Sequence, residues 1–298
     1  MNSPDILIIG RGGQLALSLA ERAAAVGLGL EYAARPLVDL SDSAALQAAV
    51  AQSRAPFIIN SAAYTAVDQA ESEPELAHRI NAVAPGVMAQ AAAQRGARLV
   101  HISTDYVFDG RSGEPYSEEA ETYPLGVYGE TKLAGEAAVR AAGGGHVVVR
   151  TAWVYSPFGK NFVKTMLTLA ESRPQVSVVD DQIGTPTCAL ALADGLLAMV
   201  KTWQSYPDRG AGETYHLAGR GESSWAGVAR ETFAISKALG GPAADVIPIP
   251  TSGYSTPAAR PRNSRLSSAK FERTFSYATP PWQDSLHPVV ERLVRGTY

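Results

Sequence analysis

The chain has 298 residues, of which 46% are hydrophobic and 18% are charged, and its net charge at pH 7 is −3. This is the composition of a globular protein with enough length for a substantial core, in one large α/β domain or in a nucleotide-binding domain with a smaller companion. No long basic tract is present, which disfavours nucleic acid as the main partner. The single cysteine, Cys188, excludes an intramolecular disulfide. Because the N-terminus lacks a signal-peptide pattern and no apolar run approaches the ~18 residues that span a bilayer, we expect a cytoplasmic protein with no membrane partner.

The first half of the chain alternates short apolar runs with longer helical patterns. Residues 6–9 are a continuous apolar run ended by glycine, as expected of a strand that is buried on both faces. Further buried strands are predicted at 57–59, 99–102 and 147–149, and helices at 14–25, 74–95 and 129–142. Strands that alternate with helices predict an α/β fold, a Rossmann-like, doubly wound parallel sheet with right-handed crossovers.

The second half is less regular. It predicts a strand at 176–179, a polar turn at 180–187 and a helix at 189–202. Residues 248–261 are rich in Pro, Ser and Thr and are expected to form an ordered loop over a site. We therefore expect a second, smaller C-terminal domain made from the later residues.

A glycine-rich turn at residues 10–16 follows the first strand and opens a helix. Such a turn lets a pyrophosphate approach the backbone and bind at the helix N-terminus, where unpaired N–H groups and the helix dipole favour negative charge. The match to the dinucleotide fingerprint is imperfect, since Ala16 takes the last small position, and a tight turn without a ligand is the alternative. The candidate cofactor contacts in this turn are Gly10, Gly12, Gly13, Gln14 and Leu15.

The position that usually contacts the ribose has no carboxylate. The second strand is followed by Arg35, which can pair with a 2′-phosphate and favours NADPH, with NADH still possible. The alternative is that Arg35 caps a surface turn. Asp39 and Leu40, which follow an expected third short strand, are candidates for contact with the adenine, although Asp39 is also suited to cap the helix that starts near Ser41.

Tyr128 and Lys132 are four residues apart and share a face of the predicted helix. An ammonium near a phenol stabilises the phenolate, lowers the tyrosine pKa from about 10 and makes the phenol a better acid toward a developing alkoxide. The lysine can also hold the nicotinamide ribose. Taken alone, the pair is more often an exposed feature of a helix.

The surrounding motifs give this pair its significance. Thr104 ends a buried strand, where it can bind a substrate carbonyl oxygen beside the Tyr128 hydroxyl, and Ile102 lies just before it. The turn after the preceding strand supplies further cofactor contacts, namely Ala62, Ala63, Tyr64 and Thr65. The motifs occur in the order that one nicotinamide pocket requires, which predicts an NAD(P)H-dependent carbonyl reductase. No histidine spacing suggests a metal site, and His101 is interpreted as a packed strand residue.

Several motifs together resemble the extended short-chain dehydrogenases/reductases, and among them the dTDP-4-dehydrorhamnose reductases. The matching segments are residues 10–16, 60–71, 103–108, 128–136, 150–155, 161–162, 181–187 and 260–266. They cover nearly the whole chain in order. The resemblance implies reduction of the 4-keto group of dTDP-4-dehydro-L-rhamnose to give dTDP-L-rhamnose, a precursor of bacterial cell-surface polysaccharide.

The resemblance also implies roles for individual residues. Tyr128 is the expected proton donor, Lys132 its partner and Thr104 the group that binds the reacting carbonyl. The expected substrate contacts are Thr104, Asp105, Tyr106, Trp153, Asn161, Arg260 and Arg265. The two arginines are candidates for the substrate diphosphate because guanidinium matches phosphate geometry, with a solvated loop as the alternative. Residues 1–155 and 189–218 are assigned to the dinucleotide-binding domain, and 156–188 and 219–298 to the sugar-nucleotide domain.

Two features of the family pattern bear on assembly and activity. Some relatives form a dimer through magnesium held by glutamates, but the matching positions here are Ser18 and Leu190, with Glu291 alone remaining, so we expect no such metal bridge and leave monomer or homodimer open. Dehydratases of this family have glutamate where this chain has Tyr106, which disfavours dehydration. An epimerase acting on another nucleotide sugar is excluded less firmly. A non-catalytic regulatory subunit, like that of methionine adenosyltransferase, is disfavoured by the intact catalytic set.

Overall fold

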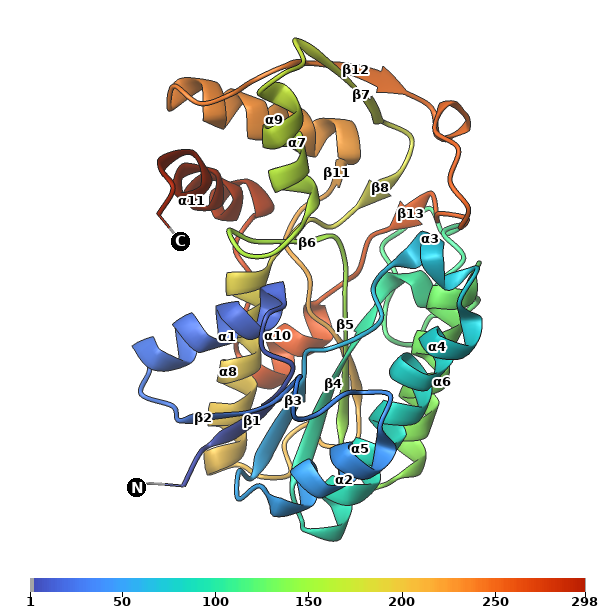
Figure 1. Ribbon diagram of the computed structural model, residues 1–298, viewed down its shortest axis with the longest axis vertical. Coiled ribbons are helices and arrows are strands. Elements are labelled where there is room, and N and C mark those ends of the chain that lie inside the picture. Colours follow the sequence, from blue (N-terminus) through green and yellow to red (C-terminus); the bar gives the residue numbers. More distant parts are fainter. Residues whose placement is uncertain (1–2, 298) are drawn as a thin grey trace.

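A computed structural model describes residues 3–297 and has a parallel sheet at its centre (Figure 1). Within these residues, six strands lie in the order β10-β5-β4-β3-β1-β2, and every neighbouring pair is parallel. Their bounds are β1 Ile6–Ile9, β2 Leu30–Ala33, β3 Phe57–Asn60, β4 Arg98–Thr104, β5 Val147–Thr151 and β10 Thr214–His216. The predicted Rossmann-like fold is confirmed. The strand order reverses between β1 and β3, and in such sheets ligands bind at the carboxyl ends of the strands beside that reversal.

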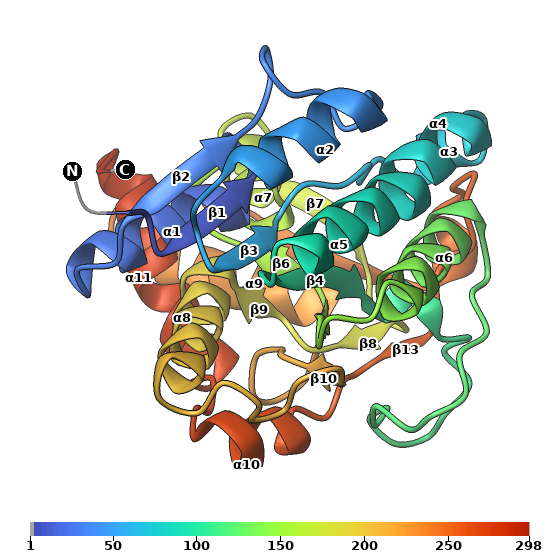
Figure 2. The same cartoon turned by 90° about the horizontal axis from the view of Figure 1, so that it is seen from below.

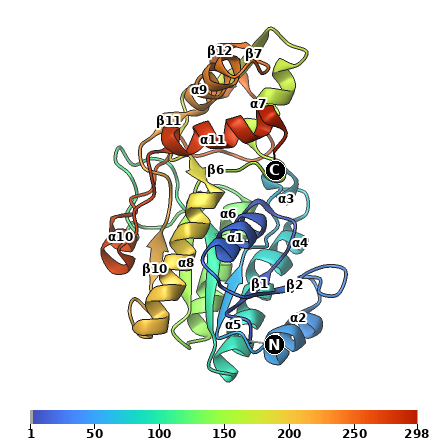
Figure 3. The same cartoon turned by 90° about the vertical axis from the view of Figure 1, so that its left-hand side faces the viewer.

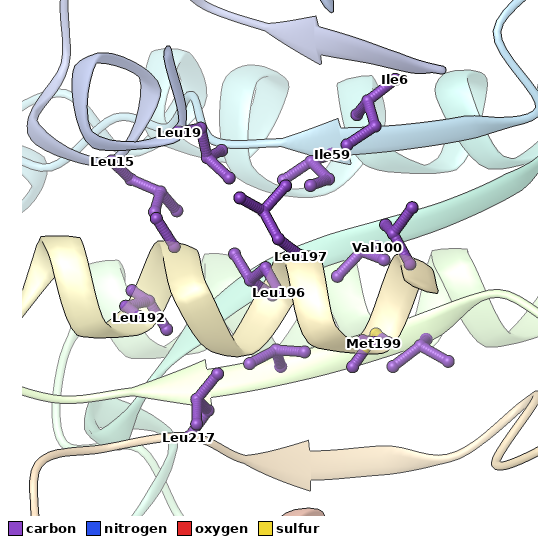
Figure 4. Close-up of a cluster of buried hydrophobic side chains, with 14 of the residues drawn as sticks. Ile6, Leu15, Leu19, Ile59, Val100, Leu192, Leu196, Leu197, Met199 and Leu217 are labelled. Atoms are coloured by element: carbon purple, nitrogen blue, oxygen red, sulfur yellow. The ribbon is translucent and has the colours of Figure 1, made fainter. Parts of the chain in front are cut away.

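Helices cover both faces of the sheet (Figure 2). One face packs against α1 Gln14–Ala25, α8 Ala189–Ser205 and α10 Ala269–Phe275, and the other against α2 Ser43–Gln52, α5 Ala84–Gln94 and α6 Val127–Ala141. Successive side chains of a strand point to opposite faces, so Ile6 and Ile8 join the first core and Leu7 and Ile9 the second. Figure 4 shows the first core between α1, α8 and the strands. Burial on both faces explains why β1 is apolar throughout.

The helical segment predicted at 74–95 is interrupted by a π-helical turn. It consists of α4 Pro74–His78, the π-helix η1 Arg79–Val83 and α5, and is preceded by the short α3 Val67–Ala70. Pro85 has no N–H to donate to the carbonyl of Asn81, so the regular hydrogen-bond series breaks there. The freed Asn81 carbonyl faces α6, where a Cβ on Gly135 would lie 2.0 Å from its oxygen. Glycine at 135 therefore permits the close packing of α6 on this turn.

The remaining elements gather beyond the carboxyl ends of the strands (Figures 1 and 3). The helices are α7 Phe162–Ala170, α9 Trp225–Ala238 and α11 Trp282–Arg295, with the 3₁₀ turns η2 Asp105–Val107 and η3 Thr251–Gly253. Three small sheets accompany them, made of β7 Gln175–Val179 with β12 Asp245–Ile249, of β8 Ile183–Gly184 with β11 Ser223–Ser224 and β13 Asn263–Ser264, and of β6 Val154–Tyr155 with β9 Thr187–Cys188. These elements have two apolar clusters of their own. The residue boundaries that we assigned to two domains stay a prediction.

Most of the strands and helices expected from the sequence are present with ends shifted by a few residues, and two expectations are wrong. No strand lies between Ala33 and Phe57 in the described chain, because residues 34–42 form turns before α2. The segment 248–261 is not a loop throughout, since Pro248 and Ile249 complete β12 beside β7. Among residues 3–297, no helix combines the length and the apolar character needed to cross a membrane.

Candidate active site

The glycine turn after β1 leaves an open surface at the N-terminus of α1. Gly10 has a φ of +95°, and a Cβ there would lie 3.0 Å from the Cβ of Ala62, so the turn requires glycine. A Cβ on Gly12 or on Gly13 would meet no heavy atom of the described residues within 4 Å. Gly13 precedes α1 and offers no side-chain cap to its first N–H groups. These unpaired donors fit the pyrophosphate of a dinucleotide.

The next two predicted contacts of this turn face the protein. Leu15 is buried in the core beneath α1. Gln14 donates to the carbonyl oxygen of Val154 at 3.3 Å and accepts from Ser156 Oγ at 2.9 Å. Gln14 therefore joins the glycine turn to the segment that follows β5, and both residues contribute to a cofactor site mainly by fixing the backbone.

The predicted adenine contacts lie in the turn that leads to α2. Asp39 accepts hydrogen bonds from the Ser41 N–H and hydroxyl at 2.8 and 2.7 Å, and these bonds lower the pKa of its carboxyl. Asp42, not Asp39, caps α2 by accepting from Ala44 and Ala45. Capping of α2 by Asp39 is therefore wrong, whereas Leu40 packs partly buried against the core.

Two arginines flank the end of β2. Arg35 is exposed in the turn that follows the strand. The guanidinium of Arg11, from the glycine turn, lies 5.7 Å from the centre of the Tyr32 ring. Arg11 was not predicted, because a residue between two glycines gives no signal for contact with the next strand. One arginine thus contacts β2 and the other follows it, and these two residues, called the Arg11–Arg35 rim, are the candidates for contact with a 2′-phosphate.

Asn81 fixes the loop after β3. Its Oδ1 accepts from the Tyr64 N–H at 2.9 Å, and its Nδ2 donates to the Tyr64 carbonyl at 3.1 Å and to Thr131 Oγ1 at 3.2 Å. The Tyr64 hydroxyl donates to Glu73 at 2.7 Å. The predicted contacts 62–65 are thus held against α6. Asn81 itself was missed, since an asparagine inside a helical pattern carries no functional signal.

Thr104 and Tyr128 meet at the carboxyl end of β4. The Tyr128 phenol lies close enough to Thr104 for that side chain to influence its pKa, and its ring packs edge-on against Tyr106 with 5.5 Å between ring centres. Thr104 Oγ1 donates to Asp105 Oδ1 at 3.0 Å. Burial raises the pKa of Tyr128 to about 12, with the Thr104 side chain opposing and the nearby Asp105 adding to the rise. Burial also raises the pKa of Asp105, which is 3% exposed, to about 6.

Lys132 lies deeper than expected. Its side chain is almost fully buried, and Nζ donates to the Ile102 carbonyl at 2.6 Å and lies 3.4 Å from Nε2 of His101. Burial lowers the pKa of Lys132 to about 8, with Glu136 opposing. The expected lowering of the Tyr128 pKa by Lys132 is wrong for this state, because Lys132 is directed at β4 and burial dominates at the phenol.

Trp153 adopts a backbone conformation that few non-glycine residues take. Its φ is +46°, and its ring stacks on Trp225 with 3.6 Å between ring centres. The face of the Trp153 indole also covers Gly184, where a Cβ would lie 2.3 Å from the ring. Packing from Trp225 and Gly184 thus holds Trp153 in a left-handed conformation that costs about 1–3 kcal/mol.

The three remaining predicted substrate contacts are engaged within the protein. Asn161 caps α7 and donates to two carbonyls of the preceding turn. Arg265 forms an ion pair with Glu222 at 2.7 Å. Arg260 forms a two-pronged ion pair with Asp68 of α3 at 2.8 and 2.9 Å and lies close enough to Tyr106 to influence its pKa. The structure therefore brings Arg260 near the catalytic residues and gives Asn161 and Arg265 internal bonds.

Comparison with known proteins agrees with this geometry. Residues 4–295 match the family model described as the RmlD substrate binding domain. The dTDP-4-dehydrorhamnose reductases of Sinorhizobium fredii and of Escherichia coli K12 are each 39% identical to this chain, the first over 97% of both chains and the second over 98% of this chain and 99% of its own. Among solved structures, the reductase of Bacillus anthracis in complex with NADP has a TM-score of 0.88 and 34% identity, covering 97% of this chain and 99% of its own.

A dTDP-glucose 4,6-dehydratase from Streptomyces venezuelae shares the fold with a TM-score of 0.78 but only 18% identity. The reductases cover the chain to about the same extent, but their identity of 34–39% is about twice as high. The resemblance seen in the sequence motifs is confirmed, and the chain belongs to the dTDP-4-dehydrorhamnose reductase family, the family of the RmlD substrate binding domain.

Proposed function

We propose that this chain reduces the 4-keto group of dTDP-4-dehydro-L-rhamnose with NADPH, giving dTDP-L-rhamnose. The observation that carries the proposal is the proximity of the Tyr128 phenol to Thr104 at the end of β4, with Lys132 buried on the next turn of α6. Curated relatives that are 39–41% identical to this chain over nearly its whole length bear the name of this reductase. The location that we propose is the cytoplasm, and the assembly a monomer or homodimer.

The protein residues support a simple division of labour. Thr104 and Tyr128 together bind the carbonyl oxygen of the substrate, and Tyr128 transfers its phenolic proton as negative charge develops on that oxygen. When bound, the nicotinamide supplies the hydride to the keto carbon. Lys132, as an ammonium, stabilises the phenolate that remains on Tyr128. Holding both partners in place converts the reaction into an effectively unimolecular step.

The cofactor assignment depends on both ends of its site. The open N-terminus of α1 fits the pyrophosphate, and the rim of Arg11 and Arg35 fits a 2′-phosphate better than a bare ribose hydroxyl. Replacing Arg35 with alanine is expected to raise KM for NADPH about tenfold or more and leave KM for NADH nearly unchanged, since an exposed charge-assisted bond to phosphate contributes about 1.5–3 kcal/mol.

The sugar-nucleotide site is proposed to include Asp105, Tyr106, Trp153 and Arg260. Arg260 is held by Asp68 of α3 and by the Ala258 carbonyl, and its remaining donors can bind a diphosphate oxygen. Asn161 and Arg265 are proposed to support the site through their internal hydrogen bonds.

The test is oxidation of NADPH and of NADH by purified protein with enzymatically generated dTDP-4-dehydro-L-rhamnose. Loss of nicotinamide absorbance together with formation of dTDP-L-rhamnose supports the proposal. Folded protein that oxidises neither cofactor contradicts it. Protein that purifies with bound NAD and interconverts nucleotide sugars without net reduction would instead indicate an epimerase.

A further inference from the structure

Lys132 contacts a buried row of polar groups, and apart from Lys132 no step of the proposed reaction uses them. The row begins at the backbone N–H of Ala62, which donates to Oδ1 of Asn60 at 3.2 Å. Nδ2 of Asn60 lies 3.0 Å from Nδ1 of His101, and Nε2 of His101 lies 3.4 Å from Nζ of Lys132. Asn60 and His101 are 1% and 0% exposed, so water does not replace these contacts.

The first bond in the row fixes the histidine tautomer. A backbone N–H can only donate, so Oδ1 of Asn60 faces Ala62 and the Asn60 amide presents its NH₂ to His101. Nδ1 of His101 is then an acceptor without a proton. A neutral imidazole carries one proton, which must lie on Nε2, the atom that faces Lys132.

A donor at Nε2 matches an amine and conflicts with an ammonium. An ammonium has only donors, and one of them is already used by the Ile102 carbonyl. A neutral Lys132 donates to that carbonyl and accepts from His101 Nε2 with its lone pair, so every group is paired. In its other tautomer, His101 can accept from an ammonium at Nε2, but its Nδ1–H then faces the NH₂ of Asn60. If the Asn60 amide is turned over to accept from that Nδ1–H, its NH₂ faces the N–H of Ala62. With an ammonium, one donor always faces another donor.

The charged groups around Lys132 do not remove this conflict. Glu136, one turn further along α6, raises the pKa of Lys132, but it is bound by Arg150 of β5 through two hydrogen bonds of 2.9 and 2.7 Å. Burial acts the other way and lowers the pKa of Lys132. Burial and the Lys132 charge also hold the pKa of His101 well below its ordinary value, which keeps the imidazole neutral.

We propose that His101, fixed by Asn60 as the tautomer with its proton on Nε2, is a positioning residue that favours the neutral amine of Lys132 in the free protein at mildly alkaline pH, so that binding of the cofactor there takes up a proton at Lys132. The negative diphosphate and the ribose hydroxyl oxygens of the cofactor both favour an ammonium. The reaction needs that ammonium beside the Tyr128 phenolate. The proposal rests on the proposed function only for the identity of the ligand.

The protonation of Lys132 in the free protein can be followed directly by NMR of lysine labelled at Cε. The chain has six lysines, and a Lys132→Arg variant identifies the signal of Lys132 among them. The informative variant is His101→Gln, because its amide oxygen can accept from the ammonium. Exchanging a donor for an acceptor beside a charged group corresponds to an upward shift of about one to two pH units in the Lys132 midpoint.

Two further variants make the test specific. Asn60→Asp presents only acceptors to Ala62 and His101, moves the histidine proton to Nδ1, and is expected to raise the Lys132 midpoint as well. The control is His146→Gln, which replaces another buried histidine whose Nδ1 accepts from the Leu99 N–H and whose Nε2 bonds to the Ala89 carbonyl. This control is expected to leave the Lys132 midpoint within a few tenths of a pH unit.

Calorimetry of NADPH binding in two buffers of different ionisation enthalpy gives the second readout. At about pH 8.5, half a unit above the Lys132 pKa of about 8, the wild-type chain is expected to take up as much as about three-quarters of a proton, and His101→Gln much less. If the Lys132 midpoint is the same in wild type and in both acceptor variants, or if proton uptake is the same, the inference is overturned but the proposed function is not. Failure of wild-type protein to bind NADPH at any pH overturns the proposed function, and the NMR result then decides the tautomer argument without it.

Discussion

Replacing Glu136 with glutamine is expected to destabilise the protein strongly, because Glu136 is buried, even though it does not contact the substrate. The Glu136 side chain is fully buried. It accepts from Ser103 at 2.6 Å and from the Arg150 guanidinium at 2.9 and 2.7 Å. Nη1 of Arg150 has no hydrogen-bond partner among the described residues, so this carboxylate is the main group that balances the buried guanidinium.

The magnitude follows from what glutamine leaves behind. It keeps the shape and one acceptor, but it removes the negative charge and leaves a nearly buried arginine uncompensated. Removing one partner of a buried ion pair destabilises by about 3–5 kcal/mol. Burial raises the pKa of Glu136, but hydrogen bonds from Arg150 and Ser103 outweigh burial and bring this pKa below its ordinary value. Its contribution is therefore present above the unfolded pKa and is lost as pH falls through the lower folded pKa.

Urea denaturation near pH 7 measures the effect, with Arg140→Ala as the matched control. Arg140 also pairs with Glu136, at 3.3 Å, but its side chain is 43% exposed, so its loss is expected to change the unfolding free energy by less than about 1 kcal/mol. The double replacement Glu136→Leu with Arg150→Met is expected to be less destabilising than Glu136→Gln, since no charge is left unpaired. A glutamine variant within about 1 kcal/mol of wild type would refute the reasoning.

Three other outcomes follow from the site. Tyr128→Phe should keep NADPH binding, measured by cofactor fluorescence, and lose about 10²-fold or more in kcat, because only the proton donor is removed. Trp225→Ala should raise KM for the sugar nucleotide about tenfold with little change in the NADPH dissociation constant, because it releases the stacked Trp153; equal effects on both would contradict a local role. The pKa of Asp105 is raised to about 6 in the folded protein, so its contribution to stability is full below its unfolded pKa and is lost as pH rises through about 6. Between pH 3 and pH 8 the wild type should therefore lose about 3 kcal/mol of unfolding free energy relative to Asp105→Asn, as measured by urea denaturation.

The parts of the fold that follow from local patterns were predictable. The apolar run at 6–9 gives β1, and the order of glycine turn, strand ends and Tyr-x-x-x-Lys places one pocket at one edge of the sheet. The two-residue strands β6, β8, β9, β11 and β13 have no periodicity to detect, since each is defined only by its partner. The same limit hid the π-helical turn, because Pro85 also suits the first turn of a new helix.

Within the site, the sequence predicted residue types better than their partners. Arg260 is bonded to Asp68, which is 192 positions away along the chain, so no spacing rule reaches it. Trp153 is held in a left-handed conformation by Trp225 and Gly184, and nothing in its own neighbourhood predicts that backbone. His101 was interpreted as a packed strand residue, and packing describes its burial but not the contact with Lys132.

The two pKa shifts at the catalytic pair fit together once the cofactor is considered. In the free protein Tyr128 has a pKa of about 12, so its phenol is a weak acid near pH 7, and Lys132 has a pKa of about 8, so it is mostly an ammonium at pH 7 and mostly neutral above pH 8. Both shifts have the same cause, burial. An anionic ligand favours the Lys132 ammonium, and that ammonium in turn favours the Tyr128 phenolate. Because His101 favours the neutral amine, the charge on Lys132 depends on the ligand above about pH 8, and the phenol becomes more acidic when the cofactor is bound. The raised pKa of Tyr128 is therefore an expected property of the free site, and it does not argue against its role as the acid.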